Sequence, residues 1–278
     1  AMVVSFYGPH LPVAPPRPWD EMYALSEVPE PFGIGEDLSG KPASQEECRR
    51  MFSDGWTREQ FLDYVRRYWG FVSFIDQQVG RILKALEETG QEDKTVVVFV
   101  SDHGDMMGEH GIIYKMLGTG YDTLMRVPLL MRYPGHLPEG RTVSQLVSLI
   151  DVLPSVLELV GIDPPEDIDG RSFLPVVRNP DMEHRERIFC DVGNAGFMVR
   201  EGRWKYCYHW DLEDAEELYD LETEPHEGTN LAYDRAYFPQ VSSMRRRLAE
   251  WLYGSRHPYA EVIAGRIEAL PEPLWTKS

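Results

Sequence analysis

The sequence is constrained most by a long helical pattern that leads directly into a short apolar run. After Thr57, apolar residues recur at steps of three and four as far as Leu86, and Thr57 and Gln60 have the spacing of a capping box. This pattern predicts an amphipathic helix that ends near Gly90. Residues 96–100 are then apolar on both faces, which is typical of a central strand in a parallel sheet covered by helices. A helix followed by a buried strand indicates an α/β fold.

Length and composition describe an ordinary globular chain. The 278 residues allow one large domain, or a main domain with a smaller companion. Hydrophobic residues make up 42% and charged residues 27%, which excludes the disordered and low-complexity classes. Acidic residues outnumber basic ones by 46 to 28, so the net charge of −18 argues against nucleic-acid and membrane-surface partners. An anionic substrate would therefore need a local cluster of cations or a metal.

Targeting signals and cysteine pairs are sparse in this sequence. No stretch approaches the roughly 18 consecutive apolar residues that a membrane span requires, and the N-terminus lacks a signal-peptide pattern. The cysteines Cys48, Cys190 and Cys207 are too few for a disulfide framework, and none belongs to a C-x-x-C pair. We expect a cytoplasmic, reducing location, although Cys190 and Cys207 could meet on neighbouring strands.

Further elements follow from shorter patterns in the first 180 residues. Residues 2–7 form an apolar, β-branched run that predicts a buried strand, and the prolines that follow indicate a surface excursion over residues 8–43. Residues 127–132 resemble another strand. From Asp151, apolar periodicity predicts a helix that stops at Gly161.

The character of the chain changes near residue 180. Short strand patterns and one helix pattern follow, with a hairpin turn at Glu201-Gly202; the strands are expected at 187–192, 196–200 and 203–208, and the helix at 244–253. Residues 206–234 hold ten acidic residues and no lysine or arginine. We therefore predict two parts. Residues 1–180 would form the α/β part with a mostly parallel sheet, and residues 181–278 a small α+β subdomain with an antiparallel sheet and a helix.

The most distinctive chemistry follows the strand at 96–100. Asp102 and His103 belong to the run Ser101-Asp102-His103-Gly104, and in open α/β sheets ligands bind at the carboxyl ends of strands. A carboxylate suits a hard divalent cation, and an imidazole binds either a metal or a substrate. An isolated Asp-His-Gly run is more often a turn in which the aspartate caps the backbone, by about two to one.

Two further residues could complete a site for an anion. Lys115 lies in a glycine-rich loop, where its ammonium group could neutralise an anionic oxygen. His10 follows the first strand and could donate a proton to a leaving oxygen. Taken singly, Lys115 is more plausibly a solvated loop lysine, and His10 a turn residue whose hydrogen bonds are satisfied.

Taken together, these residues lie within a series of motifs that resembles the sulfatases of the alkaline phosphatase superfamily. The matching segments run in order over almost the whole chain, at residues 3–12, 76–83, 98–111 with Lys115, 126–135, 148–155, 217–225 and 230–232. The resemblance implies part of an alkaline-phosphatase-like, mostly parallel sheet with flanking helices. It also implies a metal-dependent hydrolase of sulfate monoesters, with a small anionic ester as substrate.

The resemblance assigns roles to individual residues. Asp102 and His103 match the family's Asp-Asn or Asp-His pair near a calcium ion. Lys115 matches the lysine that contacts the sulfate, and His10 matches the histidine against the sulfate ester. His110 matches a frequent loop position to which we assign no role.

Two departures from the family pattern affect its chemistry. Sulfatases attack with a formylglycine made from the Cys or Ser of a C/S-x-P-x-R motif, and bind the metal also through an Asp-Asp pair near the N-terminus. Cys48 is followed by Arg49-Arg50-Met51, the other cysteines also lack the proline and arginine, and no Asp-Asp pair occurs. We therefore expect the chain to correspond to the C-terminal portion of a sulfatase, truncated, cleaved or partly supplied, with a calcium site only if further ligands are added.

Three functional hypotheses remain open from the sequence. The first is a sulfatase-type hydrolase that is inactive as this chain alone. The second is hydrolysis of phosphonate or phosphate monoesters on the same scaffold. The third is a non-catalytic remnant that acts as a binding or interaction module. If strands of the parallel sheet are absent, apolar faces or strand edges would be exposed, and we expect a homo-oligomer or association with the missing N-terminal portion.

Overall fold

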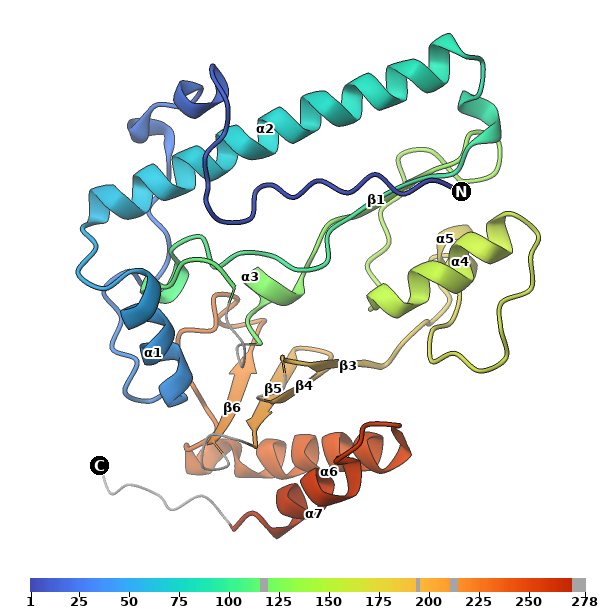
Figure 1. The fold of residues 1–278 in the computed structure, drawn as a ribbon. Coiled ribbons are helices and arrows are strands. Elements are labelled where there is room, and N and C mark those ends of the chain that lie inside the picture. Colours follow the sequence, from blue (N-terminus) through green and yellow to red (C-terminus); the bar gives the residue numbers. More distant parts are fainter. Residues whose placement is uncertain (116–119, 194–195, 211–214, 272–278) are drawn as a thin grey trace.

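The computed structural model of the protein describes residues 1–115, 120–193, 196–210 and 215–271. In Figure 1, α2 lies along one side of the molecule, α6 and α7 lie along the opposite side, and the strands lie between them. The helices and strands follow the chain as α1 (Ala43–Phe52), α2 (Arg58–Glu88), β1 (Val97–Val100), α3 (Asp122–Met125), β2 (Leu129–Arg132), α4 (Val152–Leu159), α5 (Leu174–Arg178), β3 (Arg187–Asp191), β4 (Phe197–Glu201), β5 (Trp204–His209), β6 (Ala215–Asp220), α6 (Phe238–Gly254) and α7 (Ala260–Ala269).

The long helix α2 has the start and the end that its sequence predicts. The backbone N–H of Thr57 donates to Gln60 Oε1 at 2.8 Å, and the Thr57 hydroxyl accepts from the backbone N–H of Gln60. The helix ends at Glu88, just before Gly90, whose φ of +64° suits glycine. The buried side chains of α2 all lie in its first half, which packs on the loops that carry the candidate site.

Two of the strand predictions need correction. β1 follows α2 as predicted, but it pairs antiparallel with β2, in a register that sets Val97 opposite Arg132. Among the described residues every strand pairing is antiparallel. The second half of β1 is also more exposed than a central strand, because β2 is its only partner among the described strands; Phe99 is 40% exposed.

The predicted strand at residues 2–7 is not formed. These residues make no ladder with any described strand, and Val3 is 91% exposed. An apolar, β-branched run becomes a strand only when a partner supplies its hydrogen bonds. The loop prediction for residues 8–43 holds, and part of that loop packs closely on α2. A Cβ added to Gly70 would lie 2.0 Å from the carbonyl oxygen of Trp19.

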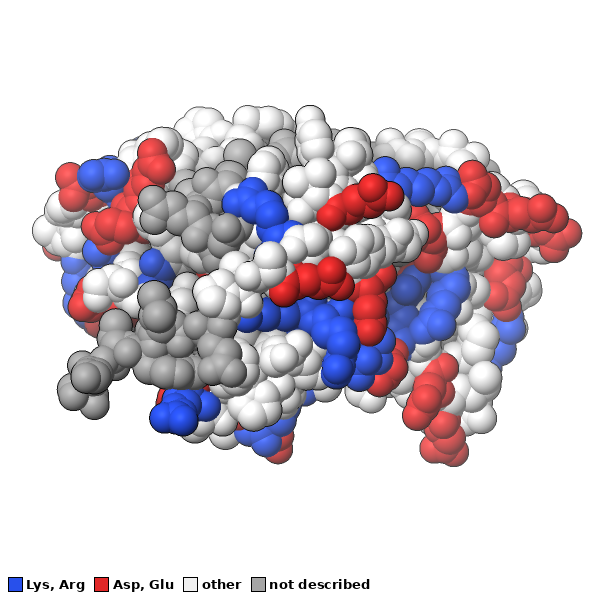
Figure 2. Space-filling model, turned by 90° about the horizontal axis from the view of Figure 1, so that it is seen from below, with Lys and Arg blue, Asp and Glu red and all other residues white. Residues whose placement is uncertain are grey.

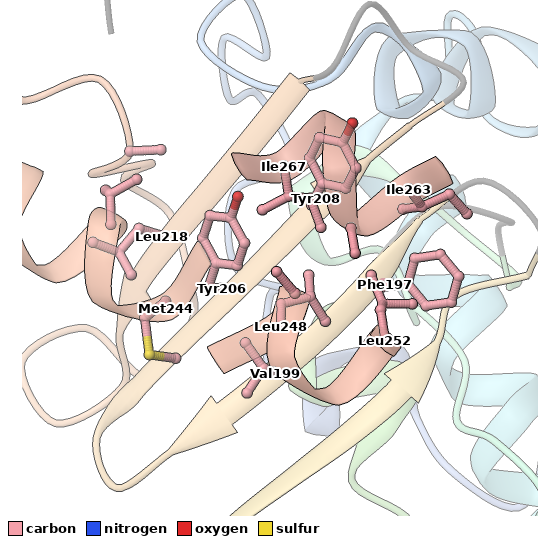
Figure 3. Packing of buried hydrophobic residues seen from close by; sticks show 14 of the residues in the cluster. Phe197, Val199, Tyr206, Tyr208, Leu218, Met244, Leu248, Leu252, Ile263 and Ile267 are labelled. Atoms are coloured by element: carbon pink, nitrogen blue, oxygen red, sulfur yellow. The ribbon is translucent and has the colours of Figure 1, made fainter. Parts of the chain in front are cut away.

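The C-terminal residues form an antiparallel sheet in the order β3-β4-β5-β6, as the hairpin pattern predicts. Gly202, at the β4–β5 turn, has a φ of +57°. One face of the sheet packs against α6 and α7, and Figure 3 shows Tyr206 and Leu248 within that packing. Five of the helices and strands escaped prediction: α1, α3, α5, β6 and α7. The two-part division at residue 180 stays a prediction.

Charged side chains of both signs occur on one face of the molecule (Figure 2). Figure 2 shows basic and acidic side chains lying among one another on the face viewed from below. Among the described residues, no helix is long and apolar enough to cross a bilayer.

Candidate active site

The loop after β1 is held by close contacts to backbone atoms, which leave no space for a side chain at Gly104. The Ser101 hydroxyl donates to the carbonyl oxygen of His103 at 2.8 Å, and the Gly104 N–H donates to the carbonyl oxygen of Leu124 at 2.8 Å. A Cβ on Gly104 would lie 1.9 Å from the carbonyl oxygen of Thr123. Glycine is therefore required here, and the loop packs directly on α3.

Asp102, His103 and Lys115 meet in this loop. Nδ1 of His103 lies 2.7 Å from the carbonyl oxygen of Gly104. Because a carbonyl oxygen only accepts, Nδ1 carries the proton and Nε2 presents a lone pair. Lys115 Nζ donates to that lone pair at 3.0 Å. The Asp102 carboxylate accepts from the His103 backbone N–H at 2.9 Å, and its other oxygen lies 3.6 Å from His103 Nε2.

His10 reaches the same loop through Tyr114. The Nδ1 of His10 lies 2.9 Å from the carbonyl oxygen of Leu11, so this nitrogen is the donor and Nε2 is the acceptor. The Tyr114 hydroxyl lies 2.7 Å from His10 Nε2 and donates to it. The four residues predicted from the sequence thus belong to one contact network, in which Tyr114 lies between His10 and Lys115.

The residues at this site fit a metal ion only in part. The Asp102 side chain is 85% exposed, which leaves its carboxylate open to a cation. The His103 lone pair already receives the Lys115 ammonium. Within the described ranges no group of three or more His, Cys, Asp or Glu residues could hold a metal. Because calcium prefers six to eight oxygen ligands, Asp102 and His103 are at most part of a calcium site.

The buried carboxylate of Asp105 accepts hydrogen bonds from several parts of the loop. It is 8% exposed, and its oxygens accept the Tyr64 hydroxyl from α2 at 3.0 and 3.1 Å. Its Oδ1 also accepts the backbone N–H groups of Met107 and Tyr114 at 2.9 and 3.1 Å. Burial raises the pKa of Asp105, and these donors oppose that rise. Asp105 lies inside the motif at 98–111 and Tyr114 directly precedes Lys115, but the sequence pattern contains no signal that separates their roles from those of their neighbours.

His110 has a structural environment away from these contacts. It is buried, its Nδ1 lies 2.7 Å from Glu36 Oε2, and its ring stacks on Tyr121 at 4.2 Å. Burial raises the pKa of Glu36, but His110 and Lys41 outweigh it, so the pKa is lowered. This histidine anchors the segment around Glu36 to the glycine-rich loop.

The cysteines offer no activated thiol. Cys48, Cys190 and Cys207 are all free. Burial raises the pKa of Cys48 to about 12 and also raises those of Cys190 and Cys207. Cys190 and Cys207 lie on β3 and β5, with Met198 of β4 between them in the register, so they do not occupy neighbouring strands.

Comparison with known proteins identifies the family of the chain. A protein-family model described as "Sulfatase" matches residues 1–162, and one described as "N-sulphoglucosamine sulphohydrolase, C-terminal" matches residues 108–253. The chain belongs to the sulfatase family, within the alkaline phosphatase superfamily. A sulfatase relative is the arylsulfatase of Clostridium perfringens, 32% identical over 93% of this chain and 54% of the relative. The choline-sulfatase of Rhizobium meliloti is 35% identical over 83% of this chain and 46% of the relative.

The sulfatase-like fold also appears among solved structures. A phosphonate monoester hydrolase from Silicibacter pomeroyi superimposes with a TM-score of 0.78 at 25% identity, covering 90% of this chain and 55% of that one. The α/β architecture with its small antiparallel sheet is therefore that of known sulfatase-like hydrolases. The chain spans about half the length of the curated relatives it matches.

Proposed function

We propose that this chain is part of a metal-dependent hydrolase of sulfate monoesters and carries one side of its active site. The observation that carries the proposal is the convergence of Asp102, His103 and Lys115 after β1, with Lys115 Nζ 3.0 Å from His103 Nε2. The sulfatase relatives support the reaction class. The substrate class is a small anionic ester, and no nucleic acid or membrane partner is proposed.

Each residue has a role that its chemistry allows. The Lys115 ammonium would neutralise charge on a sulfate oxygen, and His10, once protonated at Nε2, would donate to the oxygen of the departing alcohol. Asp102 with His103 would supply part of a calcium site. In such enzymes the metal polarises the ester oxygens and a formylglycine supplies the nucleophile. No cysteine in this chain lies in the motif that makes formylglycine, so we propose that the chain alone does not turn over substrate.

A phosphonate or phosphate monoester is the alternative substrate. The solved phosphonate monoester hydrolases from Silicibacter pomeroyi and Agrobacterium radiobacter, 25% and 27% identical to this chain, support this alternative. The same lysine and histidine would serve either anion. A non-catalytic binding module remains the third hypothesis, and it predicts no turnover in any context.

The central experiment compares the chain with a longer protein. The chain is assayed with an aryl sulfate and an aryl phosphonate monoester in calcium, alone and as part of a full-length protein that contains the formylglycine motif. We expect no turnover by the chain alone. In the longer protein, Lys115→Ala should lower kcat/KM for the preferred ester about 100-fold or more, because an anion-stabilising group is removed.

A matched control is Lys84→Ala, because Lys84 is an exposed lysine on α2 whose side chain is 71% accessible. It should leave kcat/KM unchanged. A robust rate from the chain alone that Lys115→Ala abolishes would overturn the inactivity of the chain. An active longer protein in which Lys115→Ala has no effect would overturn the proposed site.

The metal proposal has its own test. Calorimetric titration of the chain with calcium should show weak binding, since Asp102 and His103 offer few of the oxygens that calcium prefers. Asp102→Asn should remove what binding there is, whereas Asp181→Asn at an exposed position should not. Tight stoichiometric binding by the chain would contradict this prediction.

We also propose that association covers an apolar face of the chain. Val3, Phe99 and Leu130 are 91%, 40% and 59% exposed, and β1 and β2 each have an unpaired edge among the described strands. A second copy or the remaining part of a sulfatase domain would cover this face. Additional strands at these edges would build the mostly parallel sheet predicted from the sequence. The cytoplasmic location also stays a prediction.

A further inference from the structure

We propose that Tyr114 is a positioning residue for His10, and that the buried Asp105 holds Tyr114 in place. The inference rests on the proposed function only in assigning His10 to the ester. The contact itself is a property of this chain: the Tyr114 hydroxyl donates to His10 Nε2 at 2.7 Å across 104 positions of sequence.

The hydrogen bonds of His10 leave its ring one orientation. Nδ1–H donates to the carbonyl oxygen of Leu11, and Nε2 accepts from Tyr114. The rings of His10 and Tyr114 meet edge to face at 5.1 Å, and Tyr7 lies against the imidazole at 4.7 Å. Nε2, the atom that would contact a leaving oxygen, is therefore aimed at the loop that carries Lys115. His10 itself lies on a segment without helix or strand, so its orientation is set by these contacts, and Tyr114 is the one that reaches Nε2.

The backbone of Tyr114 is in turn held in an uncommon conformation by its hydrogen bonds. Its φ is +70°, a left-handed conformation that is unfavourable for a bulky residue and that persists only where other contacts enforce it. The enforcing contacts are the Tyr114 N–H to Asp105 Oδ1 at 3.1 Å and the Met106 N–H to the Tyr114 carbonyl oxygen at 3.0 Å. Asp105 is held by the Tyr64 hydroxyl of α2.

The result is a chain of contacts from α2 to the candidate site. Tyr64 holds Asp105, Asp105 holds the Tyr114 backbone, and the Tyr114 hydroxyl holds the His10 imidazole. Lys115 is the next residue along the backbone, and its Nζ lies 5.7 Å from the centre of the Tyr114 ring. One buried carboxylate thus sets both the histidine and the lysine that the proposed function assigns to the ester.

The test observes His10 directly and requires no substrate. The 278-residue chain is labelled with ¹⁵N-histidine, and its imidazole nitrogens are recorded about two pH units above the ordinary histidine pKa of about 6.5. His10 is assigned by the signal lost in His10→Gln. Tyr114→Phe removes the hydroxyl and should shift the His10 Nε2 resonance, because its hydrogen-bond donor is gone. The matched control is Tyr7→Phe, since Tyr7 also touches the imidazole ring but its hydroxyl points to the Leu11 carbonyl oxygen.

The role of Asp105 is tested by conservative rescue. Asp105→Asn keeps an acceptor for the Tyr114 N–H and should leave the His10 Nε2 resonance in place, whereas Asp105→Ala should shift it as Tyr114→Phe does. Circular dichroism checks the folding of each variant. If Asp105→Ala does not fold, Tyr114→Phe still tests the role of Tyr114, and Asp105→Asn still tests the role of Asp105.

An unmoved Nε2 resonance in Tyr114→Phe, or an equal shift in Tyr7→Phe, overturns the proposal. A shift in Asp105→Asn overturns the part assigned to Asp105. Failure of the longer protein to hydrolyse any ester would count against the proposed function alone, because the resonance is read without turnover.

Discussion

At the scale of single residues, Asp151 shows how a family motif can serve structure rather than chemistry. It is fully buried in the segment at 148–155 and accepts from the Arg171 N–H at 2.9 Å, the Ser148 N–H at 3.0 Å and Arg185 Nε at 2.8 Å. His184 Nε2 lies 3.1 Å away. Burial raises the pKa of Asp151, but Arg185 and the backbone donors outweigh it and lower the pKa to about 2.

This low pKa predicts a pH-dependent contribution to stability. A folded pKa of about 2 against an ordinary value of 3.8 corresponds to about 2 kcal/mol that favours the folded state above pH ~3.8 and is lost as the pH falls toward ~2. Asp151→Asn should therefore lower the free energy of unfolding by about 2 kcal/mol or more at pH 7, measured by urea titration. The difference from the wild-type protein should narrow below pH ~4.

Asp181→Asn, at an exposed position, serves as the control and should change the unfolding free energy by less than about 0.5 kcal/mol. An Asp151→Asn effect that stays constant down to pH ~2 would contradict an ionised, ion-paired aspartate.

At the scale of elements, the C-terminal sheet is stabilised by its packing on α6 and α7. Tyr206, Leu218 and Phe197 point from the strands, and Leu248 and Ile263 meet them from the helices; all are 1% exposed or less (Figure 3). The sheet is also tied to α6 by a buried ion pair between Glu216 and Arg245. The opposite face of the sheet is covered as well, since Cys207 and Tyr219 are buried in separate clusters.

Leu248→Ala should destabilise this packing strongly. Removing a fully buried leucine side chain costs about 2–5 kcal/mol, because apolar contacts are lost and a cavity remains. Arg246→Ala on the exposed face of the same helix is the control, with a change of less than about 0.5 kcal/mol. Urea midpoints measure both. Equal effects of the two substitutions would mean that α6 does not pack on the sheet as described.

At the scale of the whole molecule, the net charge of −18 does not place every acidic side chain on a solvated face. The acidic stretch at 206–234 contains buried carboxylates, each paired with a base: Glu216 with Arg245, Glu217 with His209, Asp220 with Arg203 and Glu227 with Lys205. Residues 211–214 of this stretch lie outside the described residues. Four carboxylates of this stretch are therefore partnered inside the protein and are not part of a solvated face.

The exposed apolar face that contains Val3, Phe99 and Leu130 is also a property of the whole molecule. Size-exclusion chromatography with light scattering of the purified chain should show association, and Leu130→Lys should reduce it by placing a charge on β2. Val262→Lys is the control, because Val262 on α7 is 63% exposed and lies away from β1 and β2. A monodisperse monomer of the wild-type chain would contradict association between copies.

Much of the architecture follows from local patterns. The capping box at Thr57, the glycine at 90 and the hairpin at Glu201-Gly202 locate their elements because each signal acts within a few residues. The strand expected at residues 2–7 failed for the opposite reason, since a strand needs a partner that local sequence does not supply. Helix α1 begins directly after the proline-containing loop and was not predicted, and β6 was missed within the acidic stretch.

For the candidate site, the sequence by itself supplied the residues that the proposed function uses: Asp102 and His103 after a strand, Lys115 in the loop, and His10 far upstream. Only the tertiary structure decided how they meet. The proton on His103 Nδ1, the Lys115 contact to Nε2 and the role of Tyr114 depend on distances between segments up to 104 positions apart. Residue type sets what a side chain is able to donate or accept, whereas the folded backbone alone determines which partner receives it.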